Sequence, residues 1–514
     1  MKRPSLVPQG SLNRILQAAE QAWHQKDFQQ NIELLERASR LAPANAGIHL
    51  QLGRMHGIRF NYTAAERCFE QAVRVSPRKT EAMALAGAYS RDFRNPELGE
   101  RYFRRAAEQK DATPEMLADL AELYERLRRV TEAAQLIERA LQLNPTCPLA
   151  LLGRARIERQ AGRLAVAEQV LYAFPADAHR LLRVRAGYEL GGILDRQGRY
   201  DEAMAAFLEA KAILRPDAVP FAAGLQTIHA RLKFLAESLN ADMFQRWLDA
   251  GLNLQPPHRL ALLGGHPRSG TTLLEQVLDS HPDIISAEET EIFHDEAYLP
   301  LTRDLPPNSL MLPVLEAAQT AGLQAARATY FRSMELSLGQ AIAGRLLIDK
   351  NPSLTYLIPA LVCIFPEIKL LVALRDPRDV VLSCFMQPFF QLAQTRSAYL
   401  TLAGAAGEYA AVMGVWCATK PLLKNPRLEV RYEDMVDDLE AVARKTLNFL
   451  EVPWDDRVLG FDRHAREKVV RSPTYADVAR PVYKSAMGRW RNYQKYLEPH
   501  LEKLEPFVKA FGYG

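Results

Sequence analysis

Cysteines are few in this sequence, and they form no recognisable pair. The 514 residues include five cysteines, and no two of them are spaced as Cys-x-x-Cys. A disulfide framework needs an even set of cysteines, and a zinc site needs clustered ligands. We therefore expect a reducing, cytoplasmic environment and no metal site.

The sequence also lacks a strong charge of one sign and a hydrophobic run long enough for a membrane. The formal net charge is +4, which gives no reason to expect nucleic-acid binding. The first ten residues carry two positive charges but no apolar segment behind them, so we expect no secretory signal. The most apolar stretch, residues 399–423, contains Glu408, and we predict a buried core helix there rather than a membrane span.

What the first 200 residues do contain is a repeat with a period of 34. One position of the repeat holds small residues and another holds large apolar ones, so that paired helices can approach closely. The small residues are Gly53, Gly87, Ala121 and Ala155, and the large ones are Leu35, Phe69, Phe103 and Ile137. The pattern resembles tetratricopeptide repeats, which implies that residues 12–215 form an all-α solenoid of helical hairpins.

A change of composition follows the repeats. Residues 216–257 are predicted to be a linker with one or two helices, because Pro256 and Pro257 stop any helix at its end. A second domain is therefore predicted from residue 258 to residue 514.

This second domain begins with a strand, a loop and a helix. An apolar run ends at Gly264 and Gly265, a polar turn follows, and apolar residues return at helical spacing after Thr271. Glycines let backbone N–H groups point inward, and a helix N-terminus adds partial positive charge. The loop therefore predicts a phosphate site.

The polar turn is close to a nucleotide-binding motif but differs from it at one position. Gly265 and Gly270 keep the Walker A spacing, whereas Thr271 stands where that motif has its lysine. Arg268 can supply the missing cation as a planar fork. Residues 267–272 resemble the 5′-phosphosulfate loop of sulfotransferases, and the arginine resembles the tyrosylprotein branch. The resemblance implies the donor 3′-phosphoadenosine 5′-phosphosulfate (PAPS), held by Arg268, Ser269, Gly270, Thr271 and Thr272.

Carboxylates follow the next short apolar run. Glu289 lies 21 residues after Arg268, a spacing that resembles that of the catalytic base in the tyrosylprotein sulfotransferases. The resemblance implies that Glu289 is the base and that Arg268 stabilises the transferring group. The alternative is that Glu289 and its neighbours only favour the dipole of a helix start. His281 and His294 are competing bases, although His281, in a His-Pro turn, is expected to make a structural hydrogen bond.

Lys350 stands at the carboxyl end of another short apolar strand. Open α/β sheets bind ligands at this end of their strands, so we expect the side chain to point into the site. It matches the lysine that related sulfotransferases use beside the transferring sulfuryl group, which implies a catalytic role. The alternative is a solvated lysine at a strand end.

A second strand that runs into a helix carries another phosphate motif. Asp376 is predicted to cap this helix. Arg375 and Ser383 are eight residues apart, which resembles the grip of sulfotransferases on the 3′-phosphate of the nucleotide. Gln387 departs from the tyrosylprotein branch, which has a second arginine there. The alternative is a capped helix whose arginine pairs with a nearby acid.

The remaining candidates lie toward the C-terminus. Tyr432 follows the last predicted strand and resembles the tyrosine beside the adenine, although a core tyrosine is the alternative. A long helix is predicted after it, at residues 435–450. Arg489, just before a tryptophan, resembles a phosphate contact of the segment that closes over the nucleotide, and Ser472 is a weaker candidate.

Together, these motifs predict a parallel-sheet α/β domain preceded by the all-α repeat domain. The resemblance implies transfer of a sulfuryl group from PAPS to a hydroxyl acceptor, without a metal. A tyrosine in a protein or peptide is the first candidate acceptor, and the repeats could help to bind it. The repeats could equally serve packing, and a homodimer stays open.

Two other classes of function also stay open. A P-loop kinase would use ATP and magnesium, but the loop lacks the lysine of that motif and no acidic metal-binding strand is evident. A tetratricopeptide scaffold with an inactive second domain would bind the nucleotide without turnover.

Overall fold

The computed structural model describes residues 9–93, 95–255, 258–388, 394–467 and 486–514. The chain divides into two compact units, residues 1–189 and 190–514. The division falls inside one helix, α11 (Arg180–Arg196), and groups the last repeat helix with the sheet. The domain boundaries that we place after residues 215 and 257 stay predictions.

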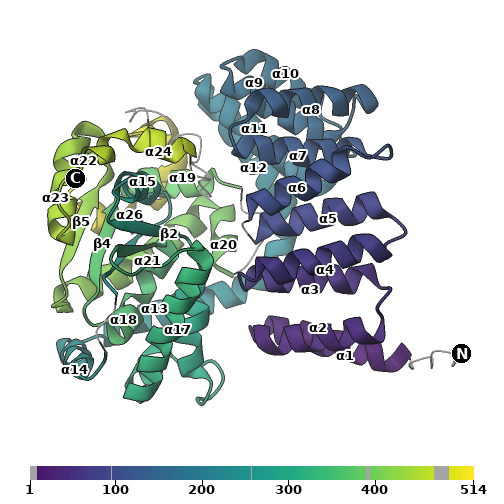
Figure 1. Cartoon of the computed structure of the whole chain (residues 1–514). Coiled ribbons are helices and arrows are strands. Elements are labelled where there is room, and N and C mark those ends of the chain that lie inside the picture. Colours follow the sequence, from purple (N-terminus) through teal and green to yellow (C-terminus); the bar gives the residue numbers. More distant parts are fainter. Residues whose placement is uncertain (1–8, 94, 256–257, 389–393, 468–485) are drawn as a thin grey trace, which may run out of the picture. The chain divides into compact units, whose positions relative to one another are not determined.

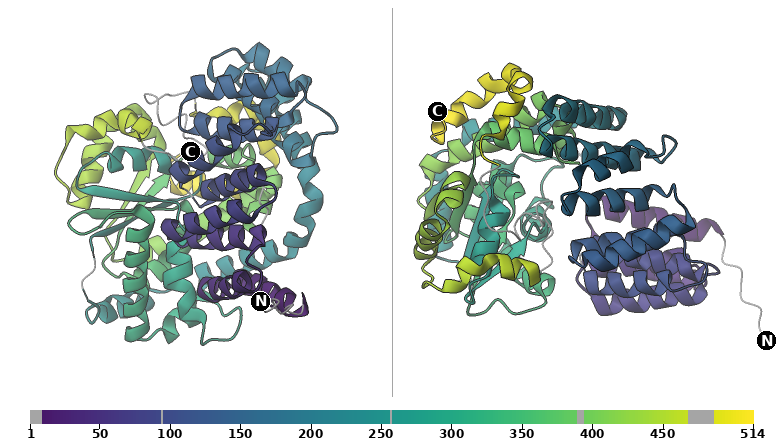
Figure 2. Two further views of the ribbon diagram at one scale, coloured as in Figure 1. Left: turned by 45° about the vertical axis from the view of Figure 1, so that its right-hand side comes forward. Right: turned by 90° about the horizontal axis from the view of Figure 1, so that it is seen from above.

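The first unit is a row of antiparallel helix pairs (Figures 1 and 2). Within a pair, a glycine of the first helix meets a large side chain of the second. A Cβ atom on Gly53 would lie 2.5 Å from the ring of Phe69, and one on Gly87 would lie 2.8 Å from that of Phe103. The predicted all-α repeat is confirmed, and its small residues are where the helices cross. The helices before α11 are α1 (Gln9–His24), α2 (Phe28–Leu41), α3 (Ala46–Ile58), α4 (Tyr62–Val75), α5 (Lys79–Asp92), α6 (Pro96–Ala107), α7 (Pro114–Arg126), α8 (Val130–Leu143), α9 (Pro148–Gln160) and α10 (Leu164–Tyr172).

Because the paired helices approach so closely, we expect alanine substitutions at two helical glycines to have opposite effects on stability. Gly53→Ala is expected to destabilise the repeats by about 1–3 kcal/mol, because the new Cβ overlaps the Phe69 ring. Gly192→Ala is the matched control, since a Cβ there meets nothing within 4 Å and gains up to about 1 kcal/mol of helix propensity. Urea denaturation followed by circular dichroism measures both. A Gly53→Ala variant as stable as the control would contradict the packing argument.

The second unit contains a five-stranded parallel sheet in the order β2-β3-β1-β4-β5. The central strand β1 is buried along its whole length, as its continuous apolar run predicts. In the register of the sheet, Leu263 of β1 lies between Lys350 of β3 and Leu371 of β4. The ends of β1 and β3 therefore meet at one edge. The strands are β1 (Leu260–Gly265), β2 (Ile284–Glu288), β3 (Leu346–Lys350), β4 (Lys369–Leu374) and β5 (Arg427–Arg431).

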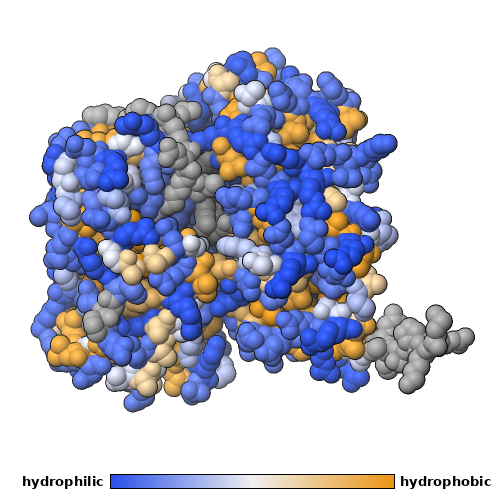
Figure 3. Space-filling model, in the orientation of Figure 1, coloured by the Kyte–Doolittle hydropathy of each residue, from blue (hydrophilic) through white to orange (hydrophobic). Residues whose placement is uncertain are grey.

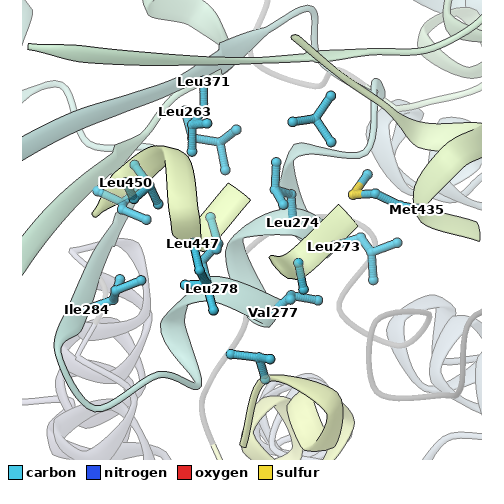
Figure 4. Close-up of a cluster of buried hydrophobic side chains, with 14 of the residues drawn as sticks. Leu263, Leu273, Leu274, Val277, Leu278, Ile284, Leu371, Met435, Leu447 and Leu450 are labelled. Carbon is cyan, nitrogen blue, oxygen red and sulfur yellow. The ribbon is translucent and has the colours of Figure 1, made fainter. Parts of the chain in front are cut away.

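Helices cover both faces of this sheet, which confirms the predicted α/β domain. On one face, α15 (Thr271–Asp279), α22 (Tyr432–Asp437) and α23 (Leu439–Leu450) pack on the strands through a cluster of buried apolar side chains (Figure 4). On the other face, Asp349 of β3 accepts a hydrogen bond of 2.9 Å from the hydroxyl of Tyr330 in α17 (Thr320–Leu338). The next residue, Lys350, points to the face of α15.

The single long helix predicted at residues 435–450 is wrong. Helix α22 already begins at Tyr432, and the chain breaks at Asp438 before α23. The side chain of Asp438 accepts a hydrogen bond of 3.0 Å from the backbone N–H of Ala441, so it caps a new helix. This local bond competes with continuation of the helix, which apolar spacing alone does not reveal.

The most apolar stretch forms helix α21 (Leu402–Thr419), as predicted for a core helix. Its acid, Glu408, is buried and lies 2.7 Å from His229 of α13 (Ala222–Ser238). Among the residues that the structure describes, no helix is both long and apolar enough to cross a membrane. Hydrophilic side chains predominate on the face drawn in Figure 3, with apolar ones scattered among them.

Candidate active site

The predicted phosphate loop connects β1 to α15, and two of its positions admit only glycine. Gly265 has φ 127°, and a Cβ there would lie 2.3 Å from the carbonyl oxygen of Ala373 in β4. Gly270, which caps α15, has φ 92°, and a Cβ there would lie 2.7 Å from the ring of Tyr432. The loop therefore passes close to both β4 and α22.

The side chains of the loop suit an anion. Ser269, Thr271 and Thr272 are buried, with 2%, 3% and 7% of their surface exposed. The first N–H groups of a helix have no partner inside it and carry partial positive charge, so α15 points donors at the loop. Arg268 adds a cation and has a left-handed backbone with φ 74°, which costs free energy for a residue other than glycine.

The second predicted motif meets the first directly. The Nε of Arg268 donates a hydrogen bond of 3.0 Å to the hydroxyl oxygen of Ser383, in helix α19 (Pro377–Phe385). Arg375, at the end of β4, donates a bond of 3.3 Å to the carbonyl oxygen of Arg268. Asp376 caps α19 as predicted, because its carboxylate accepts from the N–H of Arg378 at 2.9 Å. Residues that are 115 apart in sequence thus share one cluster.

Tyr432 lies beside this cluster. The guanidinium of Arg375 lies 4.9 Å from the centre of the Tyr432 ring, and the same ring abuts Gly270. Arg375 also donates to the carbonyl of Ala486 and lies 3.8 Å from the carboxylate of Asp379. The nearby acid that we considered as an alternative partner is therefore present, in addition to the phosphate loop.

A second cluster surrounds Lys350, which is fully buried. Its ammonium nitrogen lies 2.9 Å from Glu289, 3.3 Å from Glu275 and 3.4 Å from Glu288. Burial opposes the charge on this amine, but the three carboxylates outweigh it and raise the pKa of Lys350 above its ordinary value. Lys350 is therefore held as an ammonium ion, and it is not the solvated strand-end lysine of the alternative interpretation.

Glu289 differs from the other two carboxylates in its access to solvent. Its side chain is 39% exposed, compared with 3% for Glu288 and 0% for Glu275. It also has a left-handed backbone with φ 48°, and its N–H donates a hydrogen bond of 2.7 Å to the carbonyl of Lys350. The carboxylate of the cluster that is most open to solvent thus lies on a strained backbone.

The two competing histidines have other partners. The Nδ1 of buried His281 accepts from the N–H of Asp283 at 3.1 Å, which leaves Nε2 as the donor to the carbonyl of Pro453 at 2.9 Å. Both ring nitrogens are engaged, so His281 makes the structural hydrogen bonds that we expect of it. His294 is partly exposed and lies 2.8 Å from the carboxylate of Asp295.

Two further donor contacts were predicted, Arg489 and Ser472. The guanidinium of Arg489 pairs with Asp195, with 2.7 Å between Nη2 and Oδ2. Ser472 lies outside the described residues. The phosphate loop does bring together four of the predicted residues, Arg268, Arg375, Ser383 and Tyr432. The neighbouring strand ends bring together Lys350 and Glu289.

Sequence reasoning missed Glu275. All residues of α15 from Thr271 to Leu278 are buried, and Glu275 also accepts a hydrogen bond of 2.8 Å from the hydroxyl of Ser286. An ionisable residue flanked by the apolar positions of a helix in contact with the sheet is unusual. That position was the available signal.

Comparison with known proteins places these clusters in a family. The sulfotransferase family model matches residues 261–456, and a tetratricopeptide repeat model matches residues 90–148, 118–180 and 176–222. Protein-tyrosine sulfotransferase 1 of Danio rerio is 30% identical over 288 residues, which are 51% of this chain and 74% of that relative. This chain belongs to the sulfotransferase family. The resemblance seen in the motifs is thereby confirmed for the family.

Other similarities are more distant. An uncharacterized protein of Aquifex aeolicus is 24% identical over 417 residues, which are 79% of this chain and 52% of that protein. The chain thus spans about half the length of this curated relative. The solved sulfotransferase domain from the Synechococcus PCC 7002 olefin synthase is 22% identical, with 49% of this chain and 96% of that chain covered and a TM-score of 0.36.

Proposed function

We propose that this sulfotransferase moves a sulfuryl group from PAPS to a hydroxyl acceptor. The observation that carries the proposal is the hydrogen bond of 3.0 Å between Arg268 and Ser383. Each residue belongs to its own strand-to-helix motif, and PAPS carries phosphate groups at both its 5′ and its 3′ positions. Two adjoining sets of anion-binding groups suit such a donor.

The residues of the first cluster fit this donor. The phosphate loop would hold the 5′-phosphosulfate through hydroxyls, first-turn N–H groups and Arg268, while Arg375 and Ser383 would hold the 3′-phosphate. The ring of Tyr432, beside Gly270, would contact the adenine. The proposed donor-binding residues are Arg268, Ser269, Gly270, Thr271, Thr272, Arg375, Ser383 and Tyr432, with Arg489 and Ser472 as further proposed contacts.

The residues of the second cluster suit the chemistry. PAPS supplies an activated sulfuryl group when it is bound. Glu289, the most exposed of the three carboxylates, would accept the proton of the acceptor hydroxyl. Lys350 and Arg268 would stabilise the negative charge that develops on the transferring group and the leaving phosphate. The hydrogen bond from Lys350 to Glu289 orients the base.

A tyrosine in a protein or peptide is the acceptor that we propose first. Its phenol has a pKa of about 10, so a positioned base is useful at neutral pH. The relative from Danio rerio is named a protein-tyrosine sulfotransferase, which supports the choice. The repeats offer a helical surface of the kind that binds peptides.

Calorimetry separates the classes of function. We expect adenosine 3′,5′-bisphosphate to bind without magnesium, because cations of the chain already surround the phosphates. Binding of ATP with magnesium, and not of the bisphosphate, would favour a kinase. Bisphosphate binding without transfer of labelled sulfate to peptide tyrosine or to other hydroxyl acceptors would favour a scaffold.

Arg375→Ala is expected to weaken binding of adenosine 3′,5′-bisphosphate by about 1.5–3 kcal/mol, the usual loss for a charge-assisted contact. Adenosine 5′-phosphosulfate, which lacks the 3′-phosphate, should bind the wild type less tightly and lose little more in the variant. Calorimetry with both ligands measures this difference.

Arg378→Ala is the matched control for this prediction. Arg378 lies on the same motif, but its guanidinium pairs with Asp376 at 2.7 Å and stacks on Trp490 at 4.2 Å. Its removal should leave the preference for the 3′-phosphate intact. Equal losses for both ligands in Arg375→Ala would mean that this arginine does not read the 3′-phosphate.

A further inference from the structure

The last repeat hairpin contributes charged side chains to the unit that contains the sheet. Helix α12 (Tyr200–Ala218) packs on the end of α11, where a Cβ on Gly191 would lie 2.6 Å from the Phe207 ring. Asp195 of α11 binds Arg489 and accepts a bond of 2.7 Å from the hydroxyl of Tyr493. A tetratricopeptide repeat model matches residues 176–222, so these contacts come from a repeat and not from the family domain.

Lys211 is the most deeply buried of these charged side chains. It belongs to α12 and is fully buried, which is rare for a lysine. Its ammonium donates a hydrogen bond of 2.7 Å to the carbonyl of Tyr399 and lies 4.2 Å from the centre of the Phe385 ring. A lysine between a carbonyl and an aromatic face is a cation-π arrangement, which favours its charged form.

Both contacts of Lys211 lie directly behind the phosphate loop. Phe385 is two residues after Ser383, and between them Cys384 places its sulfur 3.4 Å from the carbonyl of Pro267. The ring of Tyr399 meets the ring of His266 edge to face, with 6.3 Å between their centres. Lys211 therefore contacts two elements that touch the loop, α19 and the 3₁₀ helix Ala398–Leu400.

The charge of Lys211 also reaches the cluster of the two arginines. Burial raises the pKa of the Cys384 thiol to about 12, and the positive charges of Arg268, Arg375 and Lys211 all act against that rise. The charge of Lys211 thus acts on a thiol that the charges of both arginines also affect. Burial lowers the pKa of Lys211 itself to about 7, so a nearby anion would strengthen its charged form.

We propose that Lys211 is a positioning residue of the donor site, through which the last repeat helix adds buried positive charge behind the phosphate loop. This inference rests on the proposed function, because it assumes an anionic donor held by Arg268, Ser383 and Arg375. By this inference, the last repeat contributes to donor binding by the sulfotransferase domain.

Lys211→Met in the full-length protein tests this. A buried unit charge at about 10 Å and an effective dielectric constant of about 20 changes affinity on the order of tenfold, so adenosine 3′,5′-bisphosphate should bind about tenfold more weakly. Adenosine 5′-monophosphate carries less charge and should lose less. A merely structural loosening would weaken both ligands alike, and that result would overturn the proposal.

Lys211→Gln separates charge from hydrogen bonding, because the amide can still donate to the Tyr399 carbonyl. It should bind the bisphosphate as weakly as Lys211→Met, and normal binding would overturn the proposal. Lys495→Met is the matched control. This lysine pairs with Asp201 of α12 at 2.8 Å, but its side chain is 63% exposed, so its loss should leave the affinity unchanged.

Arg375→Ala, measured alongside, distinguishes two kinds of failure. Weak binding in Arg375→Ala with normal binding in Lys211→Met and Lys211→Gln would reject this inference alone. Normal binding in all three variants would reject the donor site itself. Denaturation midpoints close to that of the wild type confirm that each variant is folded when it is measured.

Discussion

Glu289→Gln is expected to lower turnover by about 10²- to 10⁴-fold, while adenosine 3′,5′-bisphosphate binds nearly as tightly as before. The amide oxygen of glutamine can still accept the hydrogen bond that Lys350 donates to Glu289 at 2.9 Å. The shape of the cluster is thus kept and only the basic oxygen is lost. Initial rates with labelled PAPS and a peptide tyrosine, together with calorimetry, measure the two effects.

Two controls test the rival bases. Glu288→Gln makes the same chemical change in a side chain that is only 3% exposed, so a loss of proton transfer is not expected there. His294→Ala removes the more exposed histidine candidate. Near-normal turnover in Glu289→Gln, together with lost turnover in a folded His294→Ala protein, would show that the base is the histidine.

Lys350→Met is expected to destabilise the protein by about 3–5 kcal/mol and to abolish transfer. Without the ammonium, the buried carboxylates of Glu275 and Glu288 would lose the cation that lies 3.3 and 3.4 Å from them, and removal of one partner of a buried pair is strongly destabilising. Glu275→Gln in the same chain removes one of these charges and should restore part of the stability but not the turnover. Urea denaturation of the single and double variants measures the coupling.

The pH dependence of this effect has a definite sign. The carboxylates raise the pKa of Lys350 in the folded protein, so its contribution is complete below the ordinary lysine pKa and is lost only as pH rises through the raised value. The stabilisation that this charge gives the wild type should therefore not fall between about pH 6 and pH 9.

Lys369→Met provides the comparison for Lys350→Met. This lysine also lies on a strand and pairs with Glu451 at 3.1 Å, but that acid is 79% exposed, so the change should cost at most about 1 kcal/mol. A similarly small loss in Lys350→Met would show that the buried carboxylates are already neutral.

Features that depend on neighbours in sequence were predictable. The 34-residue period shows the repeats, because each repeat is one helical hairpin with its own small and large positions. The glycines at 265 and 270 show the phosphate loop, because only they allow its backbone. Asp376 shows the start of α19, because its carboxylate bonds to a backbone N–H two residues away.

Features that depend on distant parts of the chain were not predictable. The spacing of residues in α15 does not set Glu275 apart from its neighbours. Only the fold shows that Lys350, from β3, lies 3.3 Å from it. In the sequence, Lys211 is an ordinary residue of a repeat. Only the fold shows its contacts with Tyr399 and Phe385. Arg489 pairs with Asp195, which is 294 residues away. Spacing along the chain carries no information on such pairs.

The sequence by itself determined the repeat, the parallel-sheet domain and the two strand-to-helix motifs that name the family. Those signals are local, because they come from backbone conformation, helix caps and apolar periodicity. Only the tertiary structure decided which carboxylate of the second cluster is exposed and which cations support the phosphate loop. Burial and charge pairing depend on which elements pack together, and the residues of these clusters come from the ends of β1, β2, β3 and β4 and from helix α12.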